Sequence, residues 1–379
     1  MSHTVFLEPL NVLFLRGNKA FGDPGSFGEA LVPPWPSVVA GALRSRMLAE
    51  DKSVDLAAFA RGEIVHPTLG SPEKPGSFTV TAFHLARKKS DGVVELLIAP
   101  PADLTVFEND AGEPAAVCAL RPTVSAAGLQ SSTPLVLLPV LGEHERRKPA
   151  LGYWLTEAGW KKYLAGTVPD TSDLVKSTAL WSFDYRVGVG LEASTRRAAD
   201  GRLFSMQAVA MCAGVGFLAS VAGAEPPTDG TVRLGGDGGA AAVSLVERPQ
   251  EAFDFTAIAA ARRCRLVLTT PGIFERGWLP TGVSQTAEGD YRFELHGVRA
   301  RLICAAAPRF EVVSGWDLAK WQPKTAQRAV PAGSVYWLGE LEGTPEALRN
   351  LVEQGLWGEP CEDVTRRAEG FNRLTFAAY

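Results

Sequence analysis

The sequence predicts an α+β protein in which strands outnumber helices, built from two split-βαβ sheets. Short apolar runs, many with period two, recur along the chain between turn signals. The 38 Gly and 26 Pro follow no period, which is typical of many turns between short strands. A strand, a glycine-rich loop, a helix and several strands come first, and a similar series begins near residue 180.

The N-terminal half begins with an expected strand over 4–15 and a glycine-rich stretch over 17–28. Ser37 is placed to cap a helix over 38–50. One face of that helix carries the apolar residues Val39, Ala42, Leu43 and Met47. Further strands are expected at 77–87, 93–99 and 135–140, and a short helix is expected at 156–165.

The second series reaches the end of the sequence. Strands are expected near 182–189, 204–211, 240–246, 265–269, 298–305 and 335–341, with helices at 255–263 and 345–354. Because 166–176 reads as a linker, the predicted domains are residues 1–165 and 166–379.

Composition excludes several classes of protein. The 38 Lys and Arg against 42 Asp and Glu give a net charge of −4, so a polyanion would have to be bound by local basic patches. The five cysteines are widely spaced without C-x-x-C, which favours reduced thiols. Glu8 and Pro9 interrupt any signal-peptide core, so a cytoplasmic protein is expected. The 22 uncharged residues between Arg202 and Glu225 are rich in Ala and Gly, which favours two buried strands, or a strand and a turn within a sheet, over a membrane helix.

No motif indicates catalysis, a metal or a cofactor. Residues 188–193 match G-x-G-x-x-A by letters, but a turn rather than a helix follows, which argues against dinucleotide binding. The five histidines have no metal-binding spacing. The loop around Gly235 and Gly236 lacks the Lys-Ser/Thr of a P-loop. It reads as a turn, or as a place where another backbone or a phosphate approaches closely.

Local basic patches lie beside aromatic residues, a combination that suits single-stranded RNA because phosphates are neutralised while bases stack. The alternative for each patch is an ordinary solvated face. The cations concerned are Arg44 and Arg46 on the first helix, Arg186, Arg196, Arg197 and Arg202 around residue 195, and Lys324 and Arg328 near the C-terminus.

The segment 32–46 (VPPWPSVVAGALRSR) resembles the signature of a known family. The family is that of the third subunit of the Cmr complex, a RAMP protein of the type III-B CRISPR effector. The resemblance continues in order through 152–156, 186–195, 201–204, 234–237, 314–318 and 330–336. Residues 192–193 are Glu-Ala, whereas related RAMP subunits tend to have Asp-Arg.

The resemblance implies two ferredoxin-like, RRM-like domains with a projecting β-hairpin and long loop insertions. It also implies a non-catalytic subunit that binds the 5′ tag of CRISPR RNA and contacts target RNA indirectly. Its expected protein partners are the large polymerase-like subunit and the first backbone subunit, and no membrane partner is expected.

Two segments are expected to contact the RNA. The hairpin over 186–204 resembles the thumb of RAMP subunits, with Arg196 and Arg197 at its tip. At the start of the first helix, Ser37 and the amides of Val38 and Val39 are suited to a phosphate. Arg44 and Arg46 would add charge there, and Arg16 and Lys19 would flank the site from the loop.

Two other functions stay open. A metal-independent RAMP endonuclease that processes CRISPR RNA would need a general acid/base, usually His, in the loop after the first strand. Residues 16–30 contain no His, which argues against that role. An unrelated two-domain cytosolic enzyme has no positive feature in the sequence.

Overall fold

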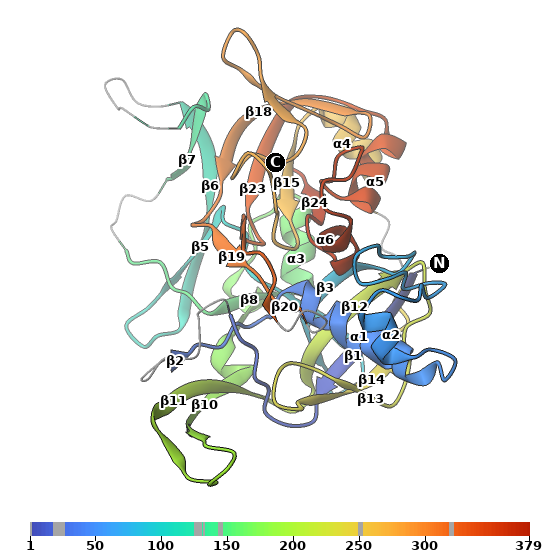
Figure 1. The fold of residues 1–379 in the computed structure, drawn as a ribbon. Coiled ribbons are helices and arrows are strands. Elements are labelled where there is room, and N and C mark those ends of the chain that lie inside the picture. Colours follow the sequence, from blue (N-terminus) through green and yellow to red (C-terminus); the bar gives the residue numbers. More distant parts are fainter. Residues whose placement is uncertain are drawn as a thin grey trace. The chain divides into compact units, whose positions relative to one another are not determined.

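A computed structural model describes residues 2–17, 27–124, 131, 133–142, 147–248, 253–317 and 322–379. Within these residues the protein is a strand-rich mixture of α and β structure with several antiparallel sheets (Figure 1). The chain divides into two compact units. The first unit contains Met1–Glu95, Thr178–Glu247 and Val312–Gln327, and the second contains Leu96–Ser177, Arg248–Glu311 and Arg328–Tyr379.

The main sheet of the first unit joins strands that are far apart in the sequence. Its strands are β1 (Ser2–Pro9), β3 (Thr79–Lys88), β4 (Val94–Ile98), β12 (Val215–Ala222), β13 (Thr231–Arg233) and β14 (Ala240–Leu245). Their order is β13-β14-β1-β12-β3-β4. The central strand β1 is antiparallel to both of its neighbours, with Leu7 opposite Phe217 on β12 and opposite Val243 on β14.

Helix α1 (Pro36–Glu50) connects β1 to β3 and lies against β3 and β13. Val39 and Leu43 on its predicted apolar face are fully buried. The helix starts earlier than expected: Trp35 is the N-cap residue, without a side-chain hydrogen bond, and Pro36 opens the first turn. Ser37 therefore lies inside the helix, and the prediction that it caps the helix is wrong. Proline has no N–H to leave unpaired and its φ is already helical, so it suits the first position.

Other elements complete the first unit. The short helix α2 (Leu56–Ala60) is capped by the Asp55 carboxylate, which accepts from two backbone amides. Strands β10 (Trp181–Leu191) and β11 (Ala198–Met211) form a long hairpin, and β2 (Phe27–Gly28) pairs in parallel with β11. Strands β20 (Trp316–Asp317) and β21 (Gln322–Pro323) form a small pair.

The uncharged stretch between Arg202 and Glu225 forms the end of β11 and all of β12, which confirms the prediction of two strands. Across the residues that the structure describes, no helix is both long enough and apolar enough to cross a membrane.

The second unit has a six-stranded sheet in the order β16-β17-β18-β23-β15-β24. These strands are β15 (Cys264–Leu268), β16 (Val283–Gln285), β17 (Tyr291–Leu295), β18 (Val298–Ala306), β23 (Val335–Glu342) and β24 (Leu374–Ala377). Its helices are α3 (Glu157–Leu164), α4 (Phe255–Ala261), α5 (Pro345–Gln354) and α6 (Val364–Glu369).

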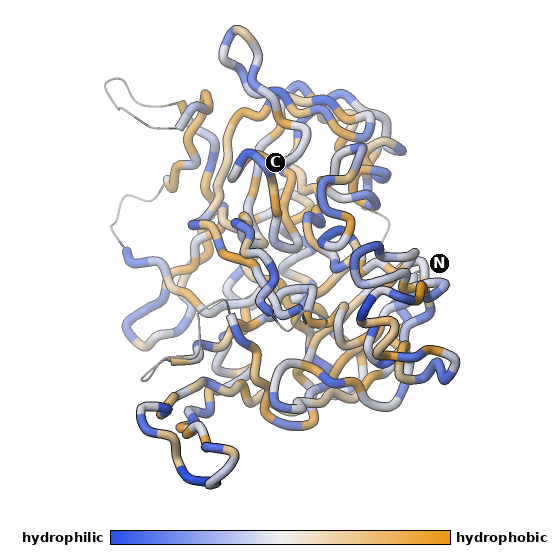
Figure 2. The backbone as a smooth tube through the Cα atoms, in the orientation of Figure 1, coloured by the Kyte–Doolittle hydropathy of each residue, from blue (hydrophilic) through white to orange (hydrophobic). Residues whose placement is uncertain are grey.

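Both faces of this sheet are covered, so β15 is buried along its whole length. On one face Leu266 packs in a cluster with Leu348 and Leu351 of α5. On the other face Val267 packs in a cluster with Trp337 and Tyr163. Figure 2 shows the resulting contrast between apolar strands and hydrophilic loops and hairpin ends.

A smaller sheet belongs to the same unit: strands β5 (Leu104–Glu108), β6 (Pro114–Val124) and β7 (Leu137–Leu141) form it in that order. Strand β8 (Tyr153–Thr156) pairs with β9 (Leu174–Lys176) and with the end of β4, where Leu97 lies opposite Thr156, so these two strands continue the sheet that contains β4. Two further short strands are β19 (Glu311–Val313) and β22 (Gln327–Ala329).

The two compact units differ from the predicted domains 1–165 and 166–379, because each is assembled from three stretches of chain. Strand pairing over long sequence distances is the reason. The partners of β1 in the sheet begin at Val215 and Ala240, beyond the expected boundary.

Candidate nucleic-acid interface

The hairpin of β10 and β11 is fixed at its base. Trp181 lies opposite Met211, and the pairing runs to Val189 opposite Leu203 before a bulge. Val209 is completely buried and exchanges backbone hydrogen bonds of 2.9 and 2.8 Å with Leu13. The base therefore belongs to the core of the first unit, and the far end extends away from that unit's sheet (Figure 1).

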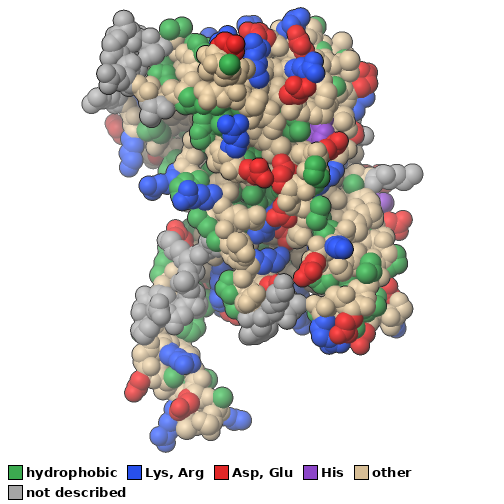
Figure 3. All heavy atoms as spheres, turned by 45° about the horizontal axis from the view of Figure 1, so that its top comes forward, with side chains coloured by type: hydrophobic (Ala, Val, Ile, Leu, Met, Phe, Trp, Pro, Cys, Tyr) green, Lys and Arg blue, Asp and Glu red, His purple; other side chains and the backbone are tan. Residues whose placement is uncertain are grey.

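The tip of the hairpin carries cations and no buried side chain. The Glu192 amide donates to the Arg197 carbonyl at 2.9 Å, and the Arg196 amide donates to the Glu192 carbonyl at 2.7 Å. Arg196 has a φ of 55°, in the left-handed region, which the tight turn requires. Arg196, Arg197 and Arg202 are all exposed. Figure 3 shows cationic side chains at the end of this lobe, at the lower left.

One face of the hairpin is an exposed apolar stripe that sequence reasoning missed. Alternate residues of β10 share this face, and their strand-paired neighbour Leu203 extends it. Tyr185 and Val187 are 67% and 73% exposed, and the Phe27 ring stacks on Tyr185 with centroids 6.4 Å apart. The stripe consists of Phe183, Tyr185, Val187, Val189, Leu191 and Leu203. The period-two alternation of β10 was the signal that could have revealed it.

Arg186 lies on the face of β10 opposite the apolar stripe, where its side chain contacts Asp184 and Phe14. Its Nε donates to Asp184 at 2.9 Å, and its guanidinium lies 5.5 Å from the ring centroid of Phe14. The Phe14 backbone in turn meets the glycine-rich turn between β13 and β14, because the Gly236 amide donates to the Phe14 carbonyl at 2.9 Å.

The predicted close approach at this turn is therefore made by another backbone. Gly235 has a φ of 78°, and a Cβ there would lie 2.9 Å from the Phe14 carbonyl oxygen. Phe14 thus brings Arg186, Gly235 and Gly236 together within the first unit. A phosphate at the same turn stays a prediction.

The start of α1 offers fewer free groups than expected. The Val38 amide donates to the Trp35 carbonyl at 2.9 Å, and Ser37 is half-buried. The indole N–H of Trp35 is buried and has no hydrogen-bond partner among the described residues.

The two arginines of α1 already have partners. Arg46 donates to the Glu50 carboxylate at 2.7 Å and to the Thr231 carbonyl at 2.6 Å. Arg44 donates to the Leu69 carbonyl at 3.4 Å. Arg16 is exposed and pairs with Ala30 through an isolated bridge, while Lys19 lies outside the described residues.

The last two predicted cations belong to different units. Lys324, in the first unit, receives a hydrogen bond of 2.8 Å from the Ser314 hydroxyl at its carbonyl oxygen. Arg328, in the second, lies with its guanidinium 4.9 Å from the Phe310 ring centroid. Arg328 and Phe310 line a hollow of about 480 Å³, together with Trp278 and Arg309. The sequence prediction did not include Phe310 or Arg309.

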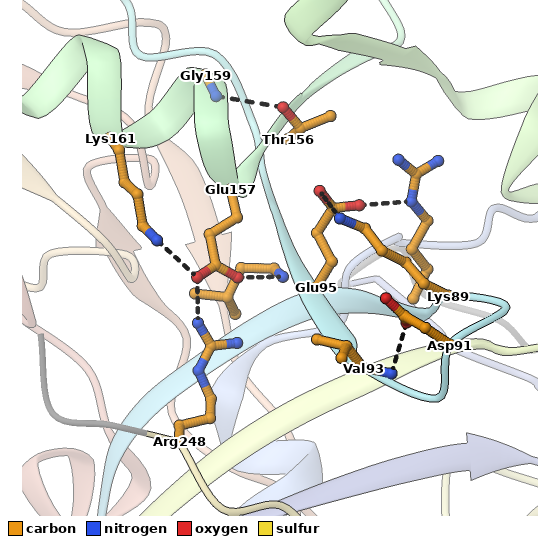
Figure 4. Close-up of polar contacts among 11 residues, drawn as sticks. Lys89, Asp91, Val93, Glu95, Thr156, Glu157, Gly159, Lys161 and Arg248 are labelled. Atoms are coloured by element: carbon orange, nitrogen blue, oxygen red, sulfur yellow. Dashed lines mark hydrogen bonds and ion pairs between the residues drawn. The ribbon is translucent and has the colours of Figure 1, made fainter.

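Figure 4 shows two carboxylates, Glu157 and Glu95, that are paired with cations. Glu157 contacts Arg248 at 2.8 Å and accepts from the Leu96 amide at 3.3 Å. Burial acts to raise the pKa of Glu157, but the Leu96 amide and Arg248 outweigh it, so the pKa is lowered. Glu95 accepts from Arg87 at 2.8 Å. Neither carboxylate is free to act as a base, and no metal-binding group of His, Cys, Asp and Glu occurs among the described residues.

The comparison with known families shows that this is a CRISPR-associated protein: residues 5–376 match a single family model. The chain belongs to the Cas_Cmr3 family, which confirms the predicted resemblance to the third Cmr subunit. No curated protein matches the sequence.

Solved structures of similar chains come from cryo-EM work on type III-B Cmr-beta. One chain, from the form bound to cognate target RNA and AMPPnP in state 1, is 13% identical, with a TM-score of 0.49 and coverage of 98% of this chain and 96% of that one. Another, from the form bound to cognate target RNA, is 14% identical with a TM-score of 0.47 and the same coverage.

Proposed function

We propose that this chain is a non-catalytic RNA-binding RAMP subunit of a type III-B CRISPR ribonucleoprotein effector complex, acting in antiviral defence. It binds the 5′ tag of the CRISPR RNA and bridges the large polymerase-like subunit and the first backbone subunit. Membership of the Cas_Cmr3 family supports this role. The observation that carries it is the β10–β11 hairpin, which is anchored in a buried core and presents three exposed arginines at its far end.

The chemistry of the hairpin suits single-stranded RNA. The guanidinium groups of Arg196, Arg197 and Arg202 can contact successive phosphates or form a stacking plane for an unstacked base. The exposed Tyr185 ring, which stacks on Phe27, adds an aromatic surface closer to the base of the same hairpin. A hairpin that carries both cations and aromatic rings can contact the phosphates and the bases of one RNA strand.

The strand orders support two ferredoxin-like domains. In the first unit β14-β1-β12-β3 places the fourth, first, third and second strands side by side, and α1 joins the first to the second. In the second unit β24-β15-β23-β18 repeats this order, and α5 lies between the third and fourth. This is the split-βαβ arrangement with one crossover helix in each unit. RRM domains use such sheets to bind RNA.

The remaining predicted contacts form part of the same proposal. At the start of α1 they are Ser37, Val38, Arg44 and Arg46, flanked by Arg16 and Lys19. Elsewhere they are Arg186, Gly235, Gly236, Lys324 and Arg328. An RNA phosphate at Arg46 would share the guanidinium with Glu50 and the Thr231 carbonyl.

Charge reversal at the hairpin tip tests the proposal. The double substitution Arg196→Glu and Arg197→Glu should lower the affinity for CRISPR RNA at least tenfold. It should also flatten the dependence of log affinity on log salt by about one unit per lost phosphate contact, measured by filter binding at several salt concentrations.

The matched control reverses two exposed arginines away from the hairpin, Arg233 and Arg349, and so changes the net charge equally. If both double variants weaken binding to the same extent, only the overall charge matters and the hairpin is not the RNA contact.

A further inference from the structure

The two faces of the β10–β11 hairpin differ in charge. Alternate residues of a strand share a face, so one face of β10 carries Asp184, Arg186, Gly188 and Gly190. A Cβ on Gly188 would lie 2.3 Å from the Phe204 ring, and a Cβ on Gly190 would lie 2.9 Å from the Arg202 side chain. The two glycines therefore leave room for these long side chains of β11, which lie across this charged face of the hairpin.

The opposite face, which contains the apolar stripe, carries no charge over the paired residues of the two strands. It consists of Trp181, Phe183, Tyr185, Val187, Val189 and Leu191 on β10, and of Met211, Val209, Gln207, Ser205, Leu203 and Ala198 opposite them on β11. An RNA phosphate brought onto this face would lose water without gaining a counter-charge, which is costly. The face therefore suits a partner surface that is itself uncharged.

The half of this face nearer the tip is aliphatic and exposed. Val187 and Leu191 are 73% and 62% exposed, and Leu203 and Val189 are 58% and 42% exposed. Val189 lies opposite Leu203, with Val187 and Leu191 two positions to either side of it, so these four side chains form one aliphatic patch. None of them has a flat ring on which a base could stack. Tyr185 lies closer to the base of the hairpin and is not part of the patch.

The aliphatic patch lies on a part of the hairpin that has only two strands among the described residues. The third strand, β2, pairs with β11 at Ser205 and Met206, on the side of Leu203 away from the tip. A two-stranded hairpin is marginally stable in water unless its apolar face is covered. Contiguous exposed apolar residues rimmed by polar ones mark sites of protein–protein contact. Cover by a protein surface would remove this aliphatic area from water.

We propose that the aliphatic patch docks onto an uncharged, aliphatic surface of a neighbouring protein subunit in the ribonucleoprotein complex. The arginines at the hairpin tip stay available to RNA. This inference rests on the proposed function, which makes the chain one subunit of such a complex. Charge decides between the occupants: an RNA strand finds no cation on this face, whereas the cores of protein interfaces are depleted of charged residues.

A site-specific photo-crosslink tests which molecule covers the patch. The photoreactive residue p-benzoylphenylalanine replaces Val187, whose exposed side chain tolerates a larger group. The complex is then reconstituted from purified subunits and CRISPR RNA, irradiated and analysed by mass spectrometry. The expected product joins this chain to a different protein subunit. A product with RNA or with a second copy of this chain, or no product at all, would overturn the proposal.

Polar substitution measures what the patch contributes to docking. Leu191→Ser with Leu203→Ser should weaken binding of the full chain to one purified partner by about tenfold, because both side chains are exposed and become buried only on docking. The large polymerase-like subunit and the first backbone subunit are measured separately by biolayer interferometry. Affinity for CRISPR RNA should stay unchanged, because no cation is removed.

The matched control is Leu56→Ser with Val65→Ser, which changes two aliphatic residues of the same unit that are 52% and 73% exposed and lie outside the hairpin. It should leave binding to both subunits unchanged. Equal loss in the two double variants, or a loss of RNA affinity with subunit binding intact, would overturn the assignment. The RNA role of the tip is tested separately by Arg196→Glu with Arg197→Glu, so failure of one proposal is distinguishable from failure of the other.

Discussion

Arg265 occupies a strand position that is buried on both sides, and three groups stabilise its charge there. Asp103 supplies the counter-charge, the carbonyls of Tyr163 and Ala378 accept from the guanidinium, and the Tyr163 ring lies 4.1 Å from it. Burial raises the pKa of Asp103, while Arg265 and the hydroxyl of Tyr163 act to lower it. Burial and the neighbouring carboxylate raise the pKa of Tyr163. The three side chains form one network.

Removal of the cation should therefore be costly. Arg265→Met leaves the Asp103 carboxylate buried without its counter-charge, which should lower the free energy of unfolding by about 3–5 kcal/mol at pH 7.5. The pKa of Asp103 should then rise further, so the folded variant binds a proton more readily than the unfolded chain does. The difference in free energy of unfolding between the unchanged chain and Arg265→Met should therefore shrink as the pH falls.

Urea unfolding midpoints at pH 7.5 and 5.5 measure both effects. The double variant Asp103→Asn with Arg265→Met should be more stable at pH 7.5 than Arg265→Met alone, because no charge stays buried. If Arg265→Met loses the same amount of stability relative to the unchanged chain at both pH values, this account of Asp103 is wrong.

At the scale of elements, the β10–β11 hairpin shows how local composition decides where a ribbon leaves the core. Its base contributes the buried Trp181, Ala208 and Val209, whereas residues 192–198 are all exposed. The tip has no large apolar side chain to bury, so nothing draws it back onto the first unit. The ribbon stays paired because its backbone hydrogen bonds run along both strands.

Deletion of residues 194–201 should leave the fold intact and weaken RNA retention in the assembled complex. The deleted residues are almost all exposed, so the free energy of unfolding should change by about 0.5 kcal/mol or less. Thermal unfolding checks the fold, and nuclease protection of the co-purified RNA checks retention. If RNA protection is unchanged and only a protein partner is lost, the hairpin holds a subunit and its assignment to RNA is wrong.

Helix α1 provides a second test at this scale. Arg44→Glu and Arg46→Glu should each lower affinity for the tag RNA and flatten its salt dependence, because each removes a cation near the helix start. Arg46→Glu should also loosen the helix, since the bonds to Glu50 and to the Thr231 carbonyl are lost. Filter binding together with circular dichroism separates the two effects. Unchanged affinity and salt slope in both variants would restrict these arginines to a structural role.

At the scale of the whole molecule, attraction to RNA should depend on the local basic patches rather than on the net charge of −4. The acidic side chains elsewhere offset the cations at the hairpin tip, so steering toward RNA should be local and sensitive to salt.

The isolated chain should neither cleave RNA nor turn over nucleotide. The carboxylates of Glu95 and Glu157 are neutralised by arginines, and the loop after the first strand has no His to serve as a general acid/base. Incubation with tagged CRISPR RNA, with and without divalent metal, followed by gel analysis is the measurement. Cleavage that persists through purification and disappears with a point substitution in this chain would support the endonuclease alternative.

Several features could be predicted because they depend on neighbouring residues. The helix predicted over 345–354 has these bounds in the structure, where Thr344 caps it and Pro345 opens it. The hairpin followed from two apolar runs around a polar middle. The strand expected over 4–15 ends at Pro9, however, and β5 and β6 were not predicted.

The sequence by itself determined the strand-rich class, the hairpin and, through motifs in a fixed order, the family. Only the tertiary structure decided which strands pair, how three stretches of chain build each compact unit, and that Trp35 rather than Ser37 caps α1. It also decided that Asp103 meets Arg265 across 162 positions of sequence. Local propensity fixes the type of an element, but the pairing of distant strands and charges depends on the burial of surfaces that become neighbours only when the chain folds.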